Sequence, residues 1–102
     1  MKLRIVGEPR IGTFFCPGCK GEHSIPLRPA DSRPSWEYSG TQDSPTLSPS
    51  ILRTWSSPEP ERFGNIVCHS FVTAGRIQFL GDCTHHLAGQ TVDLPDIPEW
   101  LQ

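Results

Sequence analysis

The chain has 102 residues, a net charge of −2 and a hydrophobic fraction of only 35%. A chain of this length forms one domain, residues 1–102, with a modest core, and its charge excludes the basic surface typical of nucleic-acid-binding proteins. The first ten residues lack the apolar segment of a signal peptide, and no run is long enough to span a membrane. We therefore expect a cytoplasmic protein whose cysteines bind metal or stay buried rather than form disulfides.

The 11 prolines and 9 glycines interrupt helical periodicity and favour short strands joined by turns. We predict an all-β fold, a small single domain of short antiparallel strands and hairpins stabilised by a zinc knuckle, without a helix longer than about two turns. Residues expected to form strands are 2–6, 13–15, 51–55, 65–73 and 76–82, followed by a final turn and strand over 87–94. Trp100, in the short tail, is expected to fold back over the core.

The segment Cys16-Pro17-Gly18-Cys19 has the spacing of a zinc knuckle, in which glycine lets the backbone turn so that both thiolates face one ion. A redox pair is the alternative, but a thioredoxin-like motif needs a βαβ setting that this neighbourhood lacks. A structural zinc requires four ligands. We expect one zinc on Cys16 and Cys19, completed by His23 and Cys68, with Cys83 left open as a further candidate.

Residues 28–50 hold four of the 11 prolines and six of the ten serines and resemble a flexible linker. Trp36 and Tyr38 argue against a linker, because residues two apart can lie on one face of a strand and anchor it. Two prolines then flank residues 46–48 and stiffen the backbone that leads to Ser50. A rigid serine is commonly a turn residue, and a nucleophile is the alternative.

Residues 65–90 concentrate the side chains that are capable of acid–base or metal chemistry, around a predicted hairpin. Half of the cysteines and three of the four histidines lie there, and Ala74-Gly75 supplies the turn. Successive side chains of a strand point to opposite faces, so Cys68 and His69 should diverge. The rest of the site therefore depends on the register of the hairpin.

Two registers are compatible with the sequence. A two-residue loop places Val72 opposite Ile77, with Cys68 diagonally near Cys83 on one face and His69 diagonally near Asp82 on the other. A three-residue loop that ends in Gly75 places Phe71 opposite Ile77 instead, and the position of the glycine favours it. Both registers remain open at this point.

His85 lies three residues beyond Asp82, where a loop can turn its ring back toward the hairpin. A carboxylate beside an imidazole fixes the tautomer and raises the basicity of the ring, for a metal ligand or a general base alike. The alternative is that Asp82 caps a turn and His85 is solvated, and we expect His86 to be solvated.

Several segments occur together and in order: CPGCKGEH at 16–23, the strand at 36–40, PTLSPSI at 45–51, CHSFVTAGRIQFLGDCTH at 68–85 and LAGQTV at 87–92. Together they resemble a family of short phage and bacterial proteins of unknown function that are often labelled ammonia monooxygenase. That label has no support here, because a membrane copper oxidase needs spans that this chain lacks. Related members, called BubE, accompany bacterial ubiquitin-like conjugation operons and are similar to deconjugating serine peptidases.

The resemblance implies that Ser50 is the nucleophile, that His69 or His85 is the base and that Asp82 orients it; Ser70 is a weaker candidate nucleophile. The reaction would be acyl transfer on a ubiquitin-like or other protein substrate, in the host bacterial cytoplasm for a phage-encoded member. No oxyanion hole can be derived from the PTLSPS segment, which lacks a GxSxG elbow.

Two other functions remain open. The chain could be a non-catalytic, zinc-stabilised module that binds a host or virion protein. Alternatively, the metal could be catalytic, held by His69, His85 and a thiolate, with Asp82 behind them. The sequence leaves the identity of the partner and the oligomeric state open.

Overall fold

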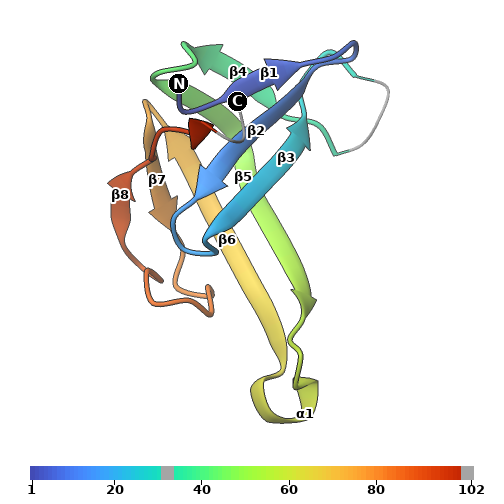
Figure 1. Ribbon diagram of the computed structural model, residues 1–102, viewed down its shortest axis with the longest axis vertical. Coiled ribbons are helices and arrows are strands. Elements are labelled where there is room, and N and C mark those ends of the chain that lie inside the picture. Colours follow the sequence, from blue (N-terminus) through green and yellow to red (C-terminus); the bar gives the residue numbers. More distant parts are fainter. Residues whose placement is uncertain (31–33, 100–102) are drawn as a thin grey trace.

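The computed structural model describes residues 1–30 and 34–99, which form an all-β fold of two antiparallel sheets (Figure 1). The strands are β1 (Arg4–Val6), β2 (Ile11–Cys16), β3 (Gly21–Pro26), β4 (Glu37–Gly40), β5 (Pro45–Ser56), β6 (Asn65–Thr73), β7 (Arg76–Phe79) and β8 (Thr91–Asp93). A single helical turn, α1 (Pro60–Phe63), joins β5 to β6 among these residues. None of the described helical residues forms a helix long and apolar enough to cross a bilayer. The expectation for Trp100 lies outside the described residues.

The smaller sheet has the order β1-β2-β3, and the cysteine knuckle is the turn between its second and third strands. Cys16 at the end of β2 pairs with Gly21 at the start of β3. β3 was not among the strands expected from the sequence. Its two-residue alternation is nevertheless present, since His23 and Ile25 are buried while Glu22 and Ser24 are exposed.

The larger sheet has the order β4-β5-β6-β7-β8, and the turn between β6 and β7 contains two residues. Val72 pairs with Ile77 and Thr73 with Arg76, so the two-residue register is the observed one. Ala74 and Gly75 have φ angles of 48° and 76°, which match the mirror-image turn that suits a twisted hairpin. The glycine is thus the second residue of a tight turn, rather than the end of a longer, bulged loop.

The two sheets pack against each other over one hydrophobic core, and the smaller sheet crosses the larger one (Figure 1). Trp36, just before β4, links the two sheets, because it forms a parallel β-bridge with Leu27, just after β3. The core includes Phe14 and Ile25 from the smaller sheet and Leu47, Ile51, Cys68, Val72, Ile77 and Phe79 from the larger. Side chains along β6 therefore alternate between the core and the outward face of the sheet.

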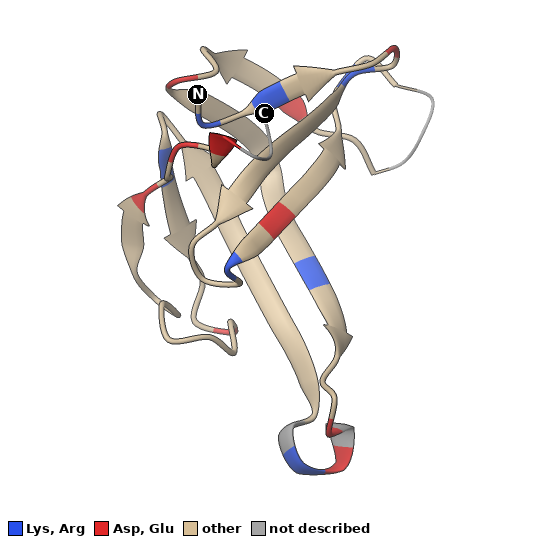
Figure 2. Cartoon of the chain, in the orientation of Figure 1, with Lys and Arg blue, Asp and Glu red and all other residues tan. Residues whose placement is uncertain are grey.

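The distal half of β5 and the start of β6 extend beyond the other strands as a two-stranded arm that ends at α1 (Figure 1). Charged residues of both signs are scattered over the chain, and β6 carries neither Lys, Arg, Asp nor Glu (Figure 2). The outward face of this central strand is consequently neutral.

The Ala74-Gly75 turn gives the first prediction. Ala74→Gly should raise the free energy of unfolding by about 1 kcal/mol, because a left-handed backbone strains a residue that has a Cβ atom. Gly75→Ala should lower it, since its Cβ would lie 3.3 Å from the Ser44 Cα at a φ of 76°. Urea unfolding measures both, and a destabilised Ala74→Gly protein would contradict the turn.

Candidate functional site

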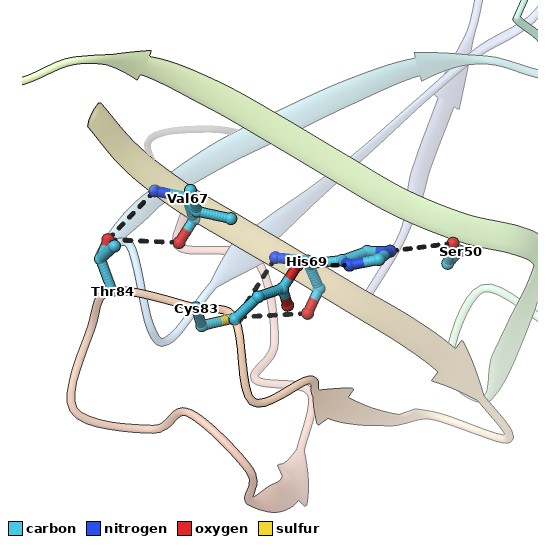
Figure 3. Close-up of polar contacts among 6 residues, drawn as sticks. Ser50, Val67, His69, Cys83 and Thr84 are labelled. Carbon is cyan, nitrogen blue, oxygen red and sulfur yellow. Dashed lines mark hydrogen bonds and ion pairs between the residues drawn. The ribbon is translucent and has the colours of Figure 1, made fainter. Parts of the chain in front are cut away.

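Ser50, His69 and Asp82 form a continuous hydrogen-bonded row on the outward face of the larger sheet (Figure 3). The Nδ1 atom of His69 lies 3.0 Å from the Asp82 Oδ2 atom, and its Nε2 atom lies 3.2 Å from the Ser50 Oγ atom. Asp82 comes from the loop after β7, His69 from β6 and Ser50 from β5. Three of the four residues predicted for the catalytic site are therefore adjacent.

The hydrogen bonds of His69 indicate its tautomer. An ionised carboxylate can only accept, so the His69 Nδ1–H group donates to Asp82. In the neutral ring, Nε2 then lacks a proton and accepts the hydrogen bond of the Ser50 hydroxyl. This order of hydroxyl, imidazole and carboxylate is the arrangement in which an imidazole can remove a proton from a serine.

A bulge in β5 places Ser50 on this face. Leu47 pairs with Val72 and Ile51 pairs with Ser70, so β5 contains two residues more than β6 across this interval. Bulges of this kind redirect side chains near functional sites. Ser50 shares a face with Leu52, which pairs with His69, and the Trp36 Nε1–H group donates to the Ser50 carbonyl oxygen at 3.2 Å.

The loop at residues 80–84 holds His69 by its backbone (Figure 3). The His69 N–H group donates to the Cys83 sulfur at 3.2 Å, and the Cys83 thiol donates back to the His69 carbonyl at the same distance. Leu80 N–H also donates to that carbonyl, at 2.9 Å. The loop that holds the backbone of His69 thus also carries Asp82, which bonds the ring.

Thr84 continues this pairing two residues further along β6. Its hydroxyl accepts the Val67 N–H group at 3.0 Å, and its own N–H group donates to the Val67 carbonyl, also at 3.0 Å. Side chains and backbone N–H groups of the loop therefore replace a regular strand as the partner of β6 beyond Phe79. The sequence analysis missed the roles of Cys83 and Thr84, because a loop that pairs through side chains has no strand-like alternation.

The structure brings together Cys16, Cys19, His23 and Cys68, the four residues expected to bind metal. Their ligand atoms all lie within 4.8 Å of one another, and the sulfur atoms of Cys16 and Cys68 are 3.7 Å apart. The Nε2 atom of His23 is buried and has no hydrogen-bond partner. A buried polar atom without a partner is costly, so the donor set fits a cation that would satisfy it.

Hydrogen bonds among the thiols shift their pKa values strongly. The pKa of Cys16 is lowered, because the Cys19 side chain, and then that of Cys68, donate hydrogen bonds to its sulfur. The same contacts with Cys16 raise the pKa of Cys19 to about 12 and raise the pKa of Cys68. The contacts among the thiols therefore favour a thiolate within the cluster, and its negative charge would attract a cation.

His85 lies with the cysteines, and its Nε2 atom is 3.6 Å from the Cys68 sulfur. The Leu87 N–H group donates to its Nδ1 atom at 3.2 Å, so the neutral ring carries its proton on Nε2 and donates to the sulfur. Burial lowers the pKa of His85 and favours this neutral form. His69 is consequently the histidine beside Ser50, and the expectation that His85 joins the same pocket is corrected.

The remaining candidates fall elsewhere. Cys83 can join Cys68 and His85 in a second group of potential ligands, but its sulfur already bonds the backbone of His69. Ser70 is only 1% exposed and faces the core, which removes it as a rival to Ser50. His86 is exposed, as expected.

The catalytic-metal alternative required His69 and His85 to meet at one ion with a thiolate. His69 instead forms hydrogen bonds with Ser50 and Asp82, while His85 forms one with Cys68. Cys68 and His69 are adjacent in β6 and lie on opposite faces, so His85, which contacts Cys68, belongs to a different cluster from His69.

One family profile, described as the bacterial ubiquitination-like system serine protease (BubE), matches residues 1–80. The chain belongs to the BubE family. The matched segment contains Ser50 and His69, and it ends just before Asp82. It also contains the four potential metal ligands, here called the metal-ligand cluster: Cys16, Cys19, His23 and Cys68. No curated protein and no solved structure matches the chain.

Close packing between Gly18 and His85 gives the second prediction. A Cβ atom at Gly18 would overlap the His85 ring, whereas one at Gly21 would meet nothing within 4 Å. Gly18→Ala should lower the free energy of unfolding by about 1–3 kcal/mol, the usual cost of overpacking. Gly21→Ala is the matched control.

The Gly18→Ala, His85→Ala double variant should recover part of this loss, because the ring that obstructs the new methyl group is gone. Chemical unfolding of wild type, Gly18→Ala, His85→Ala and the double variant gives the coupling energy between the two positions. Additive effects of the two substitutions would show that Gly18 and His85 do not pack together.

Proposed function

We propose that the chain is a serine peptidase that uses Ser50 as its nucleophile to cleave an acyl bond of a ubiquitin-like protein. The observation that carries the proposal is the row of Ser50, His69 and Asp82 at 3.2 and 3.0 Å. Membership of the BubE family supports the substrate class, because that family is described as a protease of a ubiquitination-like system.

In the first step, the Ser50 Oγ atom attacks the carbonyl carbon of the scissile bond while the His69 Nε2 atom takes the hydroxyl proton. Asp82 stabilises the imidazolium that forms. His69 then gives the proton to the leaving amine, and the acyl group remains on Ser50. Water enters with His69 again as the base, and hydrolysis of the ester releases the acid and restores Ser50.

The oxyanion of the tetrahedral intermediate needs hydrogen-bond donors. The β5 bulge takes Ser50 out of the paired positions of β4, β5 and β6. Its own N–H group is adjacent to Oγ by covalent geometry. We assign this N–H group as one donor of the oxyanion hole.

We further propose that the metal-ligand cluster binds a structural zinc ion through Cys16, Cys19, His23 and Cys68. Zn–S bonds of about 2.3 Å at tetrahedral angles separate two sulfur atoms by about 3.8 Å, and the 3.7 Å between Cys16 and Cys68 agrees with this. Four protein ligands leave no open position for substrate. Zinc would tie the β2–β3 turn to β6 beneath the Ser50 face.

The proposal includes a protein partner and a cytoplasmic location. A reducing compartment would keep the four cysteines available as thiolates for the zinc. The alternative of a non-catalytic binding module gives no reason for the hydroxyl, imidazole and carboxylate to be aligned. Peptidase activity is for this reason the function that we favour.

The third prediction concerns activity on a ubiquitin-like domain fused to a reporter. Ser50→Ala should reduce kcat/KM by about 10⁶-fold, and Asp82→Asn should reduce it by about 10⁴-fold because the imidazole loses its tautomer. Ser48→Ala is the matched control, since Ser48 is exposed on the same strand. A Ser50→Ala protein that cleaves like wild type would rule out this nucleophile.

The fourth prediction concerns metal content, measured by elemental analysis together with urea unfolding. Wild type should contain one zinc per chain, and Cys16→Ser should lose both the zinc and cooperative unfolding, because a core this small depends on its metal. Cys83→Ser should retain the zinc, since Cys83 is bonded to His69. Zinc-free wild-type protein, or loss of zinc in Cys83→Ser, would contradict the ligand set.

A further inference from the structure

The edge of β5 next to Ser50 has no strand partner among the residues that the structure describes. β4 pairs with β5 only from Pro45 to Ser48, and the rest of β5 pairs with β6 alone. Leu52 to Ser56 are all exposed. An unpaired edge presents a row of backbone donors and acceptors to any strand that can reach it.

The hydrogen bonds of β6 indicate which groups of β5 face this edge. Val67 and His69 direct their N–H and C=O groups to the loop at 80–84. Their cross-strand partners, Thr54 and Leu52, are therefore non-hydrogen-bonded positions and direct their own groups away from β6. Leu52 and Thr54 thus present free N–H and C=O groups just beyond Ser50.

Trp36 marks where this edge begins. Its Nε1–H group donates to the Ser50 carbonyl, so the outward carbonyl at the nucleophile is already satisfied. The next outward positions, Leu52 and Thr54, follow at intervals of about 7 Å along the strand. A peptide strand on this edge would be directed along β5 straight to Ser50.

We infer that the substrate binds as an added β-strand on the edge of β5, pairing its backbone with Leu52 and Thr54 so that the scissile carbonyl reaches Ser50. The inference rests on the proposed peptidase function. Strand addition is a common mode of peptide recognition, in which main-chain hydrogen bonds supply the affinity. The occupant is an extended tail of the substrate protein rather than a folded surface.

The side chains around Ser50 favour a neutral tail. Leu52 and Phe71, exposed by 54% and 41%, flank His69 on the outward face. β6 has no charged residue, and the distal part of β5 has only Arg53, whose side chain alternates to the opposite face (Figure 2). Small or apolar substrate residues next to the scissile bond would lie over Leu52 and Phe71, and the charged group on this face, Asp82, is bonded to His69.

The test compares Thr54→Pro with Thr54→Ala. Proline removes the outward N–H group, which has no partner within the sheet, and proline is tolerated at sheet edges. Alanine keeps that group.

The substrates are a library of internally quenched peptides and p-nitrophenyl acetate, a small ester that needs no strand. Thr54→Pro should lose at least tenfold in kcat/KM on the best peptide, mainly through KM, and keep wild-type ester hydrolysis. Thr54→Ala should keep both.

A second measurement does not depend on folding of the variant. Wild-type protein is assayed with the best peptide carrying a single N-methyl group at each position in turn. Strand addition predicts that methyl groups weaken cleavage at alternate residues, because only every second N–H group faces β5. Equal sensitivity at all positions, or cleavage by Thr54→Pro equal to that by Thr54→Ala, would overturn the inference.

The outcomes separate this inference from the proposed function. Ester hydrolysis that depends on Ser50, without cleavage of any peptide, would overturn strand addition and leave the nucleophile standing. If neither substrate is turned over, the peptidase proposal fails and strand addition fails with it.

Discussion

The alternation of side chains along β6 is the constraint on which both clusters depend. Cys68 points into the core toward Cys16, whereas His69 points outward to Ser50 and Asp82. A shift of one residue in the pairing of this strand would exchange the two faces and dismantle both clusters. The metal-ligand cluster and the candidate catalytic row thus lie on opposite faces of β6. The contacts that fix the register of β6 therefore position both clusters.

Three features hold that register. The Ala74-Gly75 turn ties β6 to β7, and its backbone is held in turn by the start of β5, since Gly75 N–H donates to the Pro45 carbonyl at 2.9 Å. Beyond β7, Cys83 and Thr84 bond the backbone of β6 through their side chains. Cys68 anchors the core face against the β2–β3 turn. The position of His69 is therefore fixed by the turn after β6, by the loop that pairs with β6 and by Cys68 on the core face.

The sequence predicted the fold class and the divergence of Cys68 and His69, because these depend on local composition and on the two-residue period of strands. The clustering of the four potential ligands was predicted for a related reason, since the Cys16–Cys19 spacing already limits where a cation can lie. The register of the hairpin could not be decided, because Ala74-Gly75 is compatible with two turn lengths. β3 was missed because Gly21 and Glu22 suggest a turn rather than a strand.

The position of His85 also lay beyond the sequence. A histidine three residues after Asp82 could turn to either face of β6, and the outcome depends on Gly18, which leaves space for the ring, and on Leu87, which bonds its Nδ1 atom. Both contacts are tertiary. The hydrogen bonds between Cys83 and the backbone of His69 could not be predicted from the sequence either, because a lone cysteine in a loop indicates a metal ligand or a buried thiol equally well.

The most direct test of the central claim, that Ser50 is activated by His69, is to treat the native protein with a fluorophosphonate and locate the modified residue by tandem mass spectrometry. Phosphonylation requires an activated hydroxyl and needs no knowledge of the substrate. We predict one adduct, on Ser50, that is abolished when the protein is unfolded first. An adduct on another serine, or an unmodified native protein that retains its fold, would contradict the account.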